Sequence, residues 1–526
     1  MLEGNRSQAI VAVSHERWTW HDINWKQAHR NVYRLQTRIV KAVKDKKPRQ
    51  VRALQRILTR STSAAAIAVK QVTENTGKRT PGIDGVIWRT VQEKTLGMYK
   101  IIKGQYKAKP LRRIYIPKKN GQKRPLGIPT MFDRAKQTLY LLALNPISET
   151  TADANSYGFR KNRSTADAIG QIFTVLSRQN SAQWILEADI HSCFDQISHQ
   201  WILKNIPMDK KVLQQWLSAG YIHKKKWHST TSGTPQGGAI SPVITNMVLD
   251  GLERTIKERF AKPGAKVNVI RYADDFVITS KTKEILQNDI QEEVKCFLEK
   301  RGLRLSSQKT CITSIDTGFD FLSQNVRKYK GTLLIKPSKS SCKAFMTKID
   351  EVIKGNLHIP AIRLIGLLNP IIRGWANYHR HIVCRKTFEK MDSYIWNKLI
   401  RWGKRRHPNK TKKWIFQKYY KPFKGRAMVF SGTNAKGDTI PIFQMTRIHC
   451  IRHIKVRNAA NIYDPAWSSY FTSRMKRTWL KDGKYRLQSL WKKQQGICPC
   501  CHTSITAETG WHIHHVIPRK EVVKTH

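Results

Sequence analysis

The sequence predicts an α+β multidomain protein, and three observations support that fold class. The chain has 526 residues, and a single domain rarely exceeds ~250–300 residues, so several domains are expected. Short apolar strands alternate with helical stretches between residues 180 and 330, which is typical of a mixed α/β core. Beyond Pro337 three helical stretches follow one another, which predicts a small helical bundle.

Periodicity and turn residues assign the main elements in order. Residues 24–60 have apolar positions at helical spacing among Lys and Arg, with a break at Pro48, and therefore predict basic amphipathic helices. Residues 112–128 predict a β-hairpin that turns at Asn120-Gly121. Further along, the pattern predicts a strand at 184–190, a helix at 241–260 and two strands around a polar corner at 267–280.

Charge indicates the class of partner. The chain has 96 Lys and Arg against 36 Asp and Glu, a net charge of +60. Such a charge attracts polyanions over long range, so nucleic acid is the expected partner and an acidic membrane surface the weaker alternative. No run approaches the ~20 apolar residues of a membrane helix, and no secretory signal is evident. The nine Cys are too few for a disulfide framework, so a reducing, cytoplasmic location is expected.

One segment is a candidate nucleic-acid surface. Residues 396–426 contain twelve Lys and Arg, seven aromatic residues and no acidic residue. An ordinary solvated helix face mixes charges of both signs and is the alternative interpretation. The composition favours phosphate neutralisation combined with base stacking.

The strongest chemical signal is a set of three carboxylates. Asp274 and Asp275 are adjacent at the polar corner between two apolar strands, and such a pair is costly to hold together without a neutralising cation. An Asp-Asp dipeptide alone is also common in turns. Asp189, however, ends the apolar strand at 184–190 and can supply a third oxygen ligand. Two Mg²⁺ ions ~4 Å apart need such a set to catalyse phosphoryl transfer.

A glycine-rich loop lies between these carboxylates in the sequence. Residues 232–242 read SGTPQGGAISP and lead into a helix. Glycines there allow the backbone to approach a ligand closely, and Gln236 can hydrogen-bond a nucleotide or a template edge.

In combination these motifs resemble the reverse transcriptase and maturase proteins encoded by group II introns, over roughly residues 60–520. The segments that resemble successive blocks of that family's polymerase are TPGIDG at 80–85, RRIYIPKKNGQKRPLGIPT at 112–130, SYGFRKNRST at 156–165, EADIHSCFD at 187–195, TPQGGAISP at 234–242, YADD at 272–275, GLRLSSQKT at 302–310 and FDFLSQ at 319–324. The resemblance implies a right-hand polymerase with basic fingers, a palm sheet and a three-helix thumb.

The resemblance also implies roles for individual residues. Asp189, Asp274 and Asp275 would hold two catalytic Mg²⁺ ions, and Lys309 would protonate the leaving pyrophosphate. The dNTP would be contacted by Lys118 and Arg124 at its triphosphate, by Phe194 under its sugar, by Gln236 and by the backbone carbonyl of Ile190. For Lys118, Arg124 and Lys309 the alternative is ordinary surface charge. For Phe194 the alternative is a core aromatic position.

The C-terminal segment resembles the start of an HNH nuclease domain. Cys498 and Cys501 have the C-x-x-C spacing of zinc ligands. His514 and His515 match the motif's paired histidines, the first as a metal ligand and the second as a general base. The motif's later Asn, final His and second Cys pair should follow, but the chain ends at VVKTH after Glu521. A truncated remnant with absent or very weak nuclease activity is therefore expected.

The resemblance divides the chain into five expected regions. They are a basic helical N-terminal extension at 1–60, fingers and palm at 61–335, a thumb or maturase domain at 336–430 with the signature LIGLLNPIIRGWANYHR at 364–380, a DNA-binding region at 431–495 and the nuclease remnant at 496–526.

The expected function is RNA-directed DNA polymerase and splicing maturase of a group II intron. The protein would bind intron RNA and copy it at a target DNA that supplies the primer, in a bacterial cytoplasm or an organelle. Three alternatives remain. They are a splicing cofactor with little polymerase activity, a retron-type or other bacterial reverse transcriptase, and a homing endonuclease with an accessory domain.

Overall fold

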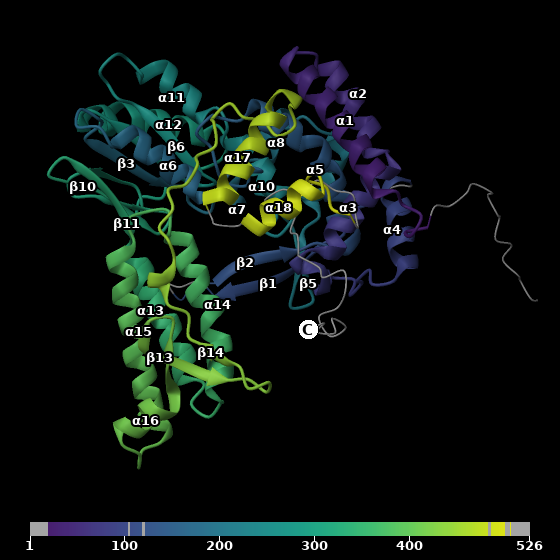
Figure 1. The fold of residues 1–526 in the computed structure, drawn as a ribbon. Helices are drawn as coiled ribbons and strands as arrows, with labels where there is room; N and C mark the ends of the chain where they lie inside the picture. Colours follow the sequence, from purple (N-terminus) through teal and green to yellow (C-terminus); the bar gives the residue numbers. More distant parts are fainter. Residues whose placement is uncertain are drawn as a thin grey trace, which may run out of the picture.

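The protein is mainly helical, with four small sheets, in the computed structural model (Figure 1). Residues 339–441 project away from the main body as helices and a small sheet, and the chain then returns across that body (Figure 1). The structure describes residues 19–103, 106–117, 121, 123–481, 485–499 and 505.

The N-terminal helices share one apolar core with a later long helix. Asn24 caps the first helix by accepting a hydrogen bond from the Gln27 backbone N–H, and Pro48 begins the second. This confirms the predicted basic helices and their break, because Pro suits the first turn of a helix. The elements are α1 (Trp25–Lys44), α2 (Pro48–Thr59), α3 (Thr62–Glu74), η1 (Thr76–Arg79), α4 (Val91–Ile102) and α5 (Met131–Thr151).

The predicted basic hairpin is present. Strands β1 (Leu111–Pro117) and β2 (Lys123–Ile128) are antiparallel partners. The first of them also pairs in parallel with β4 (Tyr221–His223), which is followed by β5 (Lys226–His228). The hairpin is thereby attached to a segment about a hundred residues away in the sequence.

A four-stranded antiparallel sheet forms the centre of the molecule, in the order β6-β7-β3-β8. Its strands are β3 (Trp184–Asp189), β6 (Asn268–Tyr272), β7 (Asp275–Ser280) and β8 (Cys311–Ser314). Leu186 and Ile278 belong to one apolar cluster, whereas Ile185 and Val277 belong to another. Both faces of the sheet are therefore covered, which explains why these strands are apolar throughout.

Short helices surround this sheet. They are α6 (Thr165–Leu176), α7 (Cys193–Gln196), α8 (His199–Asn205), α9 (Lys210–Ser218), α10 (Ser241–Leu249), α11 (Leu252–Phe260), η2 (Ile285–Ile290) and α12 (Gln291–Glu299). The prediction of one helix over 241–260 is wrong, because Gly251 has a φ of +98° and separates α10 from α11. The Asp250 carboxylate pairs there with the buried Arg271, which fixes the interruption.

The predicted helical bundle beyond Pro337 is also confirmed. A small sheet of β9 (Phe319–Phe321), β10 (Gln324–Tyr329) and β11 (Thr332–Pro337) leads into it. Its elements are α13 (Lys339–Lys354), α14 (Ala361–His379), α15 (Arg385–Arg406) and α16 (Lys412–Tyr419), followed by the sheet of β12 (Tyr420–Phe423), β13 (Arg426–Thr433) and β14 (Thr439–Pro441).

The stacking surface expected over 396–426 is wrong for three of its seven aromatic residues. Trp402, Tyr419 and Tyr420 are buried in the core that α15 and α16 share with β13. They supply the apolar contacts that hold the β12–β14 sheet against the helices. Trp396 stays exposed.

The chain then returns to the central body through two short turns and two helices, η3 (Met445–Arg447), η4 (Pro465–Trp467), α17 (Ser468–Lys481) and α18 (Tyr485–Lys493) (Figure 1). Asp167 on α6 anchors this segment, accepting hydrogen bonds from the Val456 backbone N–H at 2.7 Å and from Arg474 at 3.1 Å. Arg163 donates to the Asn458 carbonyl at 3.0 Å. None of the helices in the described ranges is long and apolar enough to cross a membrane.

Candidate active site

The register of the central sheet brings the three predicted carboxylates together. Asp189, the last residue of β3, lies directly opposite Asp275, the first residue of β7. Asp274 occupies the tight turn between β6 and β7, where Ala273 has a φ of +58°. Directly opposed residues on antiparallel strands are close neighbours, so the three carboxylates lie together at one end of the two central strands.

The segment 155–158 supports this turn from outside the sheet. The Tyr157 backbone N–H donates to the Arg271 carbonyl at 2.9 Å, and the Arg271 backbone N–H donates to the Asn155 carbonyl at 2.9 Å. A Cβ atom on Gly158 would lie 2.3 Å from the Ala273 backbone nitrogen. Only glycine allows the two backbones to approach so closely.

The buried Arg271 side chain ties the turn to a helix. Its guanidinium donates to the Ala273 carbonyl at 3.2 Å and to Asn246 on α10 at 3.1 Å, and it pairs with Asp250. The Asn246 amide donates to the Gly158 carbonyl at 2.7 Å. The sequence analysis did not identify Arg271 and Asn246. An arginine within an otherwise apolar strand could have indicated a buried charge with a partner.

Burial and mutual repulsion make the carboxylates reluctant to ionise together. Burial of the Asp275 carboxyl, then the charges of Asp274 and Asp189, raise its pKa to about 7, although part of the residue faces solvent. Burial is also the main cause that raises the pKa of Asp274. Lys309 lies beside this group, and its Nζ atom is 2.6 Å from an Asp189 oxygen. That hydrogen bond raises the pKa of Lys309.

The glycine-rich loop packs on the short helix that carries Phe194. The Thr234 backbone N–H donates to the Phe194 carbonyl at 2.6 Å. Gln236 donates from its side chain to Asp195 at 3.2 Å, and its carbonyl accepts from the Gly127 backbone N–H of β2 at 2.7 Å. The half-buried Phe194 ring meets Phe159 edge to face, with 6.3 Å between ring centroids. The loop therefore connects the β1–β2 hairpin to helix α7, which follows the strand that ends in Asp189.

The other three residues predicted to contact the nucleotide are Arg124, Ile190 and Lys118, and the structure describes two of them. Arg124 on β2 is exposed, and its charge reaches Asp274, because it contributes to lowering the pKa of that carboxyl. Ile190 is buried and bridges to Leu305. Lys118 lies outside the described residues.

The nuclease-like segment is described only in part. Cys498 is a free cysteine among the described residues. The expected partners Cys501, His514 and His515 lie outside them.

Three family models match the chain. Residues 116–326 match reverse transcriptase (RNA-dependent DNA polymerase), residues 20–101 match the N-terminal domain of reverse transcriptase, and residues 342–420 match the group II intron maturase-specific domain. The chain belongs to the group II intron reverse transcriptase family. The polymerase of this family is an RNA-directed DNA polymerase, so the three carboxylates lie within a reverse transcriptase domain.

Individual relatives agree with this membership. The chain is 31% identical to Protein YkfC of Escherichia coli (strain K12) over 318 residues, or 53% of this chain and 83% of the relative. It is 30% identical to the group II intron-encoded protein LtrA of Lactococcus lactis subsp. cremoris, over 51% of this chain and 55% of LtrA. It is 28% identical to a putative COX1/OXI3 intron 1 protein of Saccharomyces cerevisiae, over 49% of this chain and 38% of that protein. The chain thus spans about half the length of LtrA.

The donor set of this reverse transcriptase fits a divalent metal ion. Reverse transcriptases generally use such ions. Among the residues that the structure describes, no three His, Cys, Asp or Glu side chains are grouped closely enough to hold one as they stand. However, Asp189 and Asp275 lie directly opposite each other, and Lys309 pairs with Asp189. Carboxylate oxygens brought together in this way are suited to a hard divalent cation.

The raised pKa of Asp275 predicts that the folding stability of the metal-free protein depends on pH. An unfolded Asp ionises near pH ~3.9, whereas the folded carboxyl ionises at about 7. Folding stability is therefore lost as the pH rises between these values. In EDTA, Asp275→Asn is expected to raise the free energy of unfolding at pH 8 by on the order of 1–2 kcal/mol after allowance for solvent screening.

Thermal unfolding followed by tryptophan fluorescence at pH 4 and pH 8 measures this effect. The gain from Asp275→Asn should shrink toward pH 4, while the exposed Asp289→Asn should show no such dependence on pH. An Asp275→Asn protein that is less stable than wild type at pH 8 would contradict the assignment.

Proposed function

We propose that the protein copies a group II intron RNA from a DNA primer at its target site, in a ribonucleoprotein with that RNA. The observation that carries the proposal is the alignment of Asp189 with Asp275 beside the Asp274 turn. The match of residues 342–420 to the maturase-specific domain supports intron RNA as the partner and template. In this proposal the β1–β2 hairpin acts as fingers and helices α13–α15 act as the thumb.

Each residue of the site would have a distinct task. Asp189, Asp274 and Asp275 would hold two Mg²⁺ ions, which lower the pKa of the primer 3′-hydroxyl and stabilise charge on the transferred phosphate. Arg124 and Lys118 would neutralise the triphosphate of the dNTP. Lys309 would remain protonated and donate its proton to the leaving pyrophosphate. Ile190 would contribute its backbone carbonyl near the metal ligands.

Gln236 and Phe194 would position the nucleotide. The Gln236 backbone is fixed by Gly127 and its side chain by Asp195, so the residue joins the triphosphate-binding hairpin to the helix that carries Phe194. The Phe194 ring would lie under the sugar and leave no room for a 2′-hydroxyl.

The direct test is extension of a labelled DNA primer annealed to an RNA template, with the purified full chain, dNTPs and Mg²⁺. We expect extension that stops with EDTA. No extension would refute the polymerase proposal. A splicing assay with the cognate intron RNA tests the maturase proposal separately, and splicing without extension would favour the cofactor alternative.

Phe194 is expected to determine the choice between dNTPs and rNTPs. Phe194→Val should raise the ratio of kcat/KM for an rNTP over the matching dNTP by ~10²-fold, because the added space admits a 2′-hydroxyl. Single-nucleotide incorporation of dCTP and rCTP opposite the same template base measures this ratio. Phe173→Val, at a half-exposed ring on α6, is the matched control. An unchanged ratio would leave Phe194 as a packing residue only.

The other regions extend the proposal. The boundaries would be those expected at residues 60, 335, 430 and 495, with target DNA bound by 431–495. Cys498 and Cys501 would bind zinc in a nuclease-like segment with His514 and His515. The free described cysteines support a reducing compartment, which we propose to be a bacterial cytoplasm or an organelle.

A further inference from the structure

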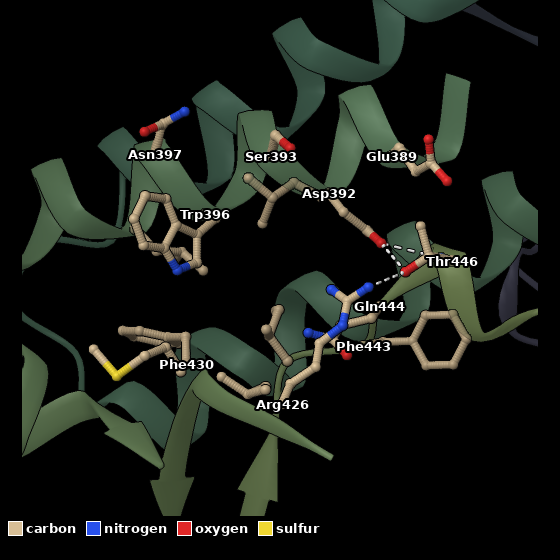
Figure 2. Close-up of a pocket in the computed structure, with 15 residues that line it drawn as sticks. Glu389, Asp392, Ser393, Trp396, Asn397, Arg426, Phe430, Phe443, Gln444 and Thr446 are labelled. Carbon is tan, nitrogen blue, oxygen red and sulfur yellow. Dashed lines mark hydrogen bonds between the residues drawn. The ribbon is translucent and has the colours of Figure 1, made fainter. Parts of the chain in front are cut away.

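A cavity of about 450 Å³ lies between α15 and β13, apart from the carboxylate site. Trp396 and Asp392 project into it from the helix, and Arg426 and Phe430 face them from the strand (Figure 2). The volume falls within the ~300–1,000 Å³ range of pockets that bind small molecules. The cavity is therefore large enough for one nucleobase with its sugar.

Eight of the fifteen residues that line this cavity are apolar, and three of these eight are aromatic. The Trp396 side chain is 38% exposed and Met428 is 41% exposed, whereas Phe430 beneath them is 1% exposed. The Trp396 ring stacks on Phe416, with 6.0 Å between ring centroids, and meets Tyr420 edge to face. The indole is thus held in place by the core, and a base could stack on it with little loss of entropy.

Two acidic residues line the cavity, Glu389 and Asp392, and both have partners: Glu389 pairs with Arg385. Asp392 accepts hydrogen bonds from the backbone N–H groups of Met445 at 2.9 Å and Thr446 at 3.0 Å, and from the Thr446 hydroxyl at 2.8 Å. The same hydroxyl accepts from the Arg426 guanidinium at 3.2 Å. Asp392 therefore fixes the segment that orients Arg426.

A second cavity of about 720 Å³ shares Arg426 and Thr446 with the first and is strongly basic. It is lined by Arg385, Lys424, Arg426, Thr446, Arg447, Ile448, His449 and Cys450. Arg385 donates to the Thr446 carbonyl at 2.7 Å, and Arg447 donates to the Phe423 carbonyl at 2.8 Å. Carbonyl oxygens orient a guanidinium without neutralising it. Among the Lys and Arg side chains that line this cavity, only Arg385 pairs with a carboxylate of the described residues. Its partner is the exposed Glu389, at 3.1 Å, and such surface pairs are weak.

We propose that these two adjoining cavities bind one unpaired nucleotide of a structured RNA. The base would stack on Trp396 in the first cavity, and its phosphate would contact Arg426, Arg447 and Lys424 in the second. A base in a duplex is inaccessible, whereas bases of loops and bulges can be extruded onto aromatic side chains. This inference rests on the proposed RNA-binding function, to which it adds a specific subsite.

The test compares two RNA hairpins of equal length, one fully paired and one with a single-nucleotide bulge, bound by the full chain over a range of salt. Wild type should prefer the bulged RNA. Trp396→Ala should weaken bulged-RNA binding about tenfold, because one stacked base is lost, and leave paired-RNA binding and the salt dependence unchanged. Arg426→Gln should reduce the slope of log K against log salt by about one.

Two variants separate the nucleotide contact from general loss of structure. Trp396→Phe keeps an aromatic ring and should retain most of the bulge preference. Trp227→Ala removes an indole that is 57% exposed on β5, outside both cavities, and should retain all of it.

Three results would overturn the inference. In the first, the wild-type protein binds paired and bulged RNA equally well. In the second, the preference for bulged RNA survives Trp396→Ala. In the third, Trp396→Ala weakens binding to single-stranded DNA and leaves binding to bulged RNA unchanged. Primer extension by the same preparation distinguishes failure of the nucleotide-binding inference from failure of the proposed polymerase function. If wild type extends a primer on RNA but ignores the bulge, only the inference fails; if it does not extend, the proposed function fails.

Discussion

Asp274→Asn is expected to reduce RNA-templated primer extension by at least ~10³-fold, because under the proposed function it would remove a charged metal ligand at the point where the phosphate reacts. Asp274 occupies the turn between β6 and β7 beside the aligned pair of Asp189 and Asp275. Asparagine has nearly the same size, so the turn and the surrounding hydrogen bonds should survive. The result is measured as single-turnover extension of a DNA primer at saturating dNTP and Mg²⁺.

RNA binding is the companion measurement for this variant. The +60 charge of the chain is distributed over its whole length, so removal of one negative charge should not weaken binding to RNA. Asp289→Asn, the same substitution at an exposed position on η2, should extend primers at the wild-type rate. If Asp274→Asn extends as fast as wild type, the carboxylates are not the catalytic centre. If it also loses RNA binding, the substitution has disturbed the fold.

The polymerase proposal can be separated from the pure splicing-cofactor alternative on physical grounds. Burial and repulsion raise the pKa of Asp275 to about 7, and this arrangement costs folding stability in the absence of a cation. A protein that only bound RNA would gain stability by replacing one of these carboxylates. The cost is explained if metal binding offsets it during catalysis.

Local signals in the sequence were sufficient to predict the central hairpin and its carboxylates. Apolar residues on both sides of the Asp274-Asp275 pair predict two buried strands around a polar turn, as found in β6 and β7. Asp189 could be predicted at a strand end for the same reason. Its position opposite Asp275 depends on strand register, which is determined by packing across the sheet and cannot be read from one segment.

Features that depend on distant contacts were not predictable in this way. The break between α10 and α11 involves the pairing of Asp250 with Arg271, and the docking of the C-terminal segment depends on Asp167, almost 290 residues before Val456. Trp402, Tyr419 and Tyr420 of the segment 396–426 were misinterpreted because they pack in a core shared with β13. Only the tertiary structure shows that Trp402 faces the core while Trp396 faces a cavity.

Gly158→Ala is expected to reduce the kcat of primer extension by ~10²-fold or more, with KM for the primer–template changed much less. The added Cβ would lie 2.3 Å from the Ala273 backbone nitrogen and 3.0 Å from its Cα. Both atoms belong to the turn that carries Asp274, and no flexible side-chain end is available to move aside. The contact must therefore displace the turn, and a ~1 Å displacement of a reacting group costs about 10²-fold in rate.

Hydrogen bonds around Gly158 limit how far the segment 155–158 can move away from the β6–β7 turn. Its carbonyl is held by Asn246 on α10, and its neighbour Tyr157 is hydrogen-bonded to Arg271, so the segment 155–158 cannot retreat without breaking these bonds. The β6–β7 turn is held by its two strands and by the bond from the Arg271 guanidinium to the Ala273 carbonyl, and its displacement moves the carboxylate of Asp274. The expected lesion is thus a misplaced Asp274 in a folded protein, visible as lost extension with RNA binding retained.

Gly366→Ala is the matched control for this substitution. Gly366 lies within α14, where an added Cβ meets nothing within 4 Å, so alanine there should stabilise the helix by up to ~1 kcal/mol and leave extension unchanged. If Gly158→Ala extended primers at the wild-type rate, the 155–158 segment would not position the catalytic turn. If it abolished RNA binding as well, the contact would be needed for folding of the whole domain. Lost kcat with retained binding would show that primer extension depends on the position of Asp274 to within ~1 Å, as the proposed function expects of a carboxylate that holds a metal ion beside the reacting phosphate.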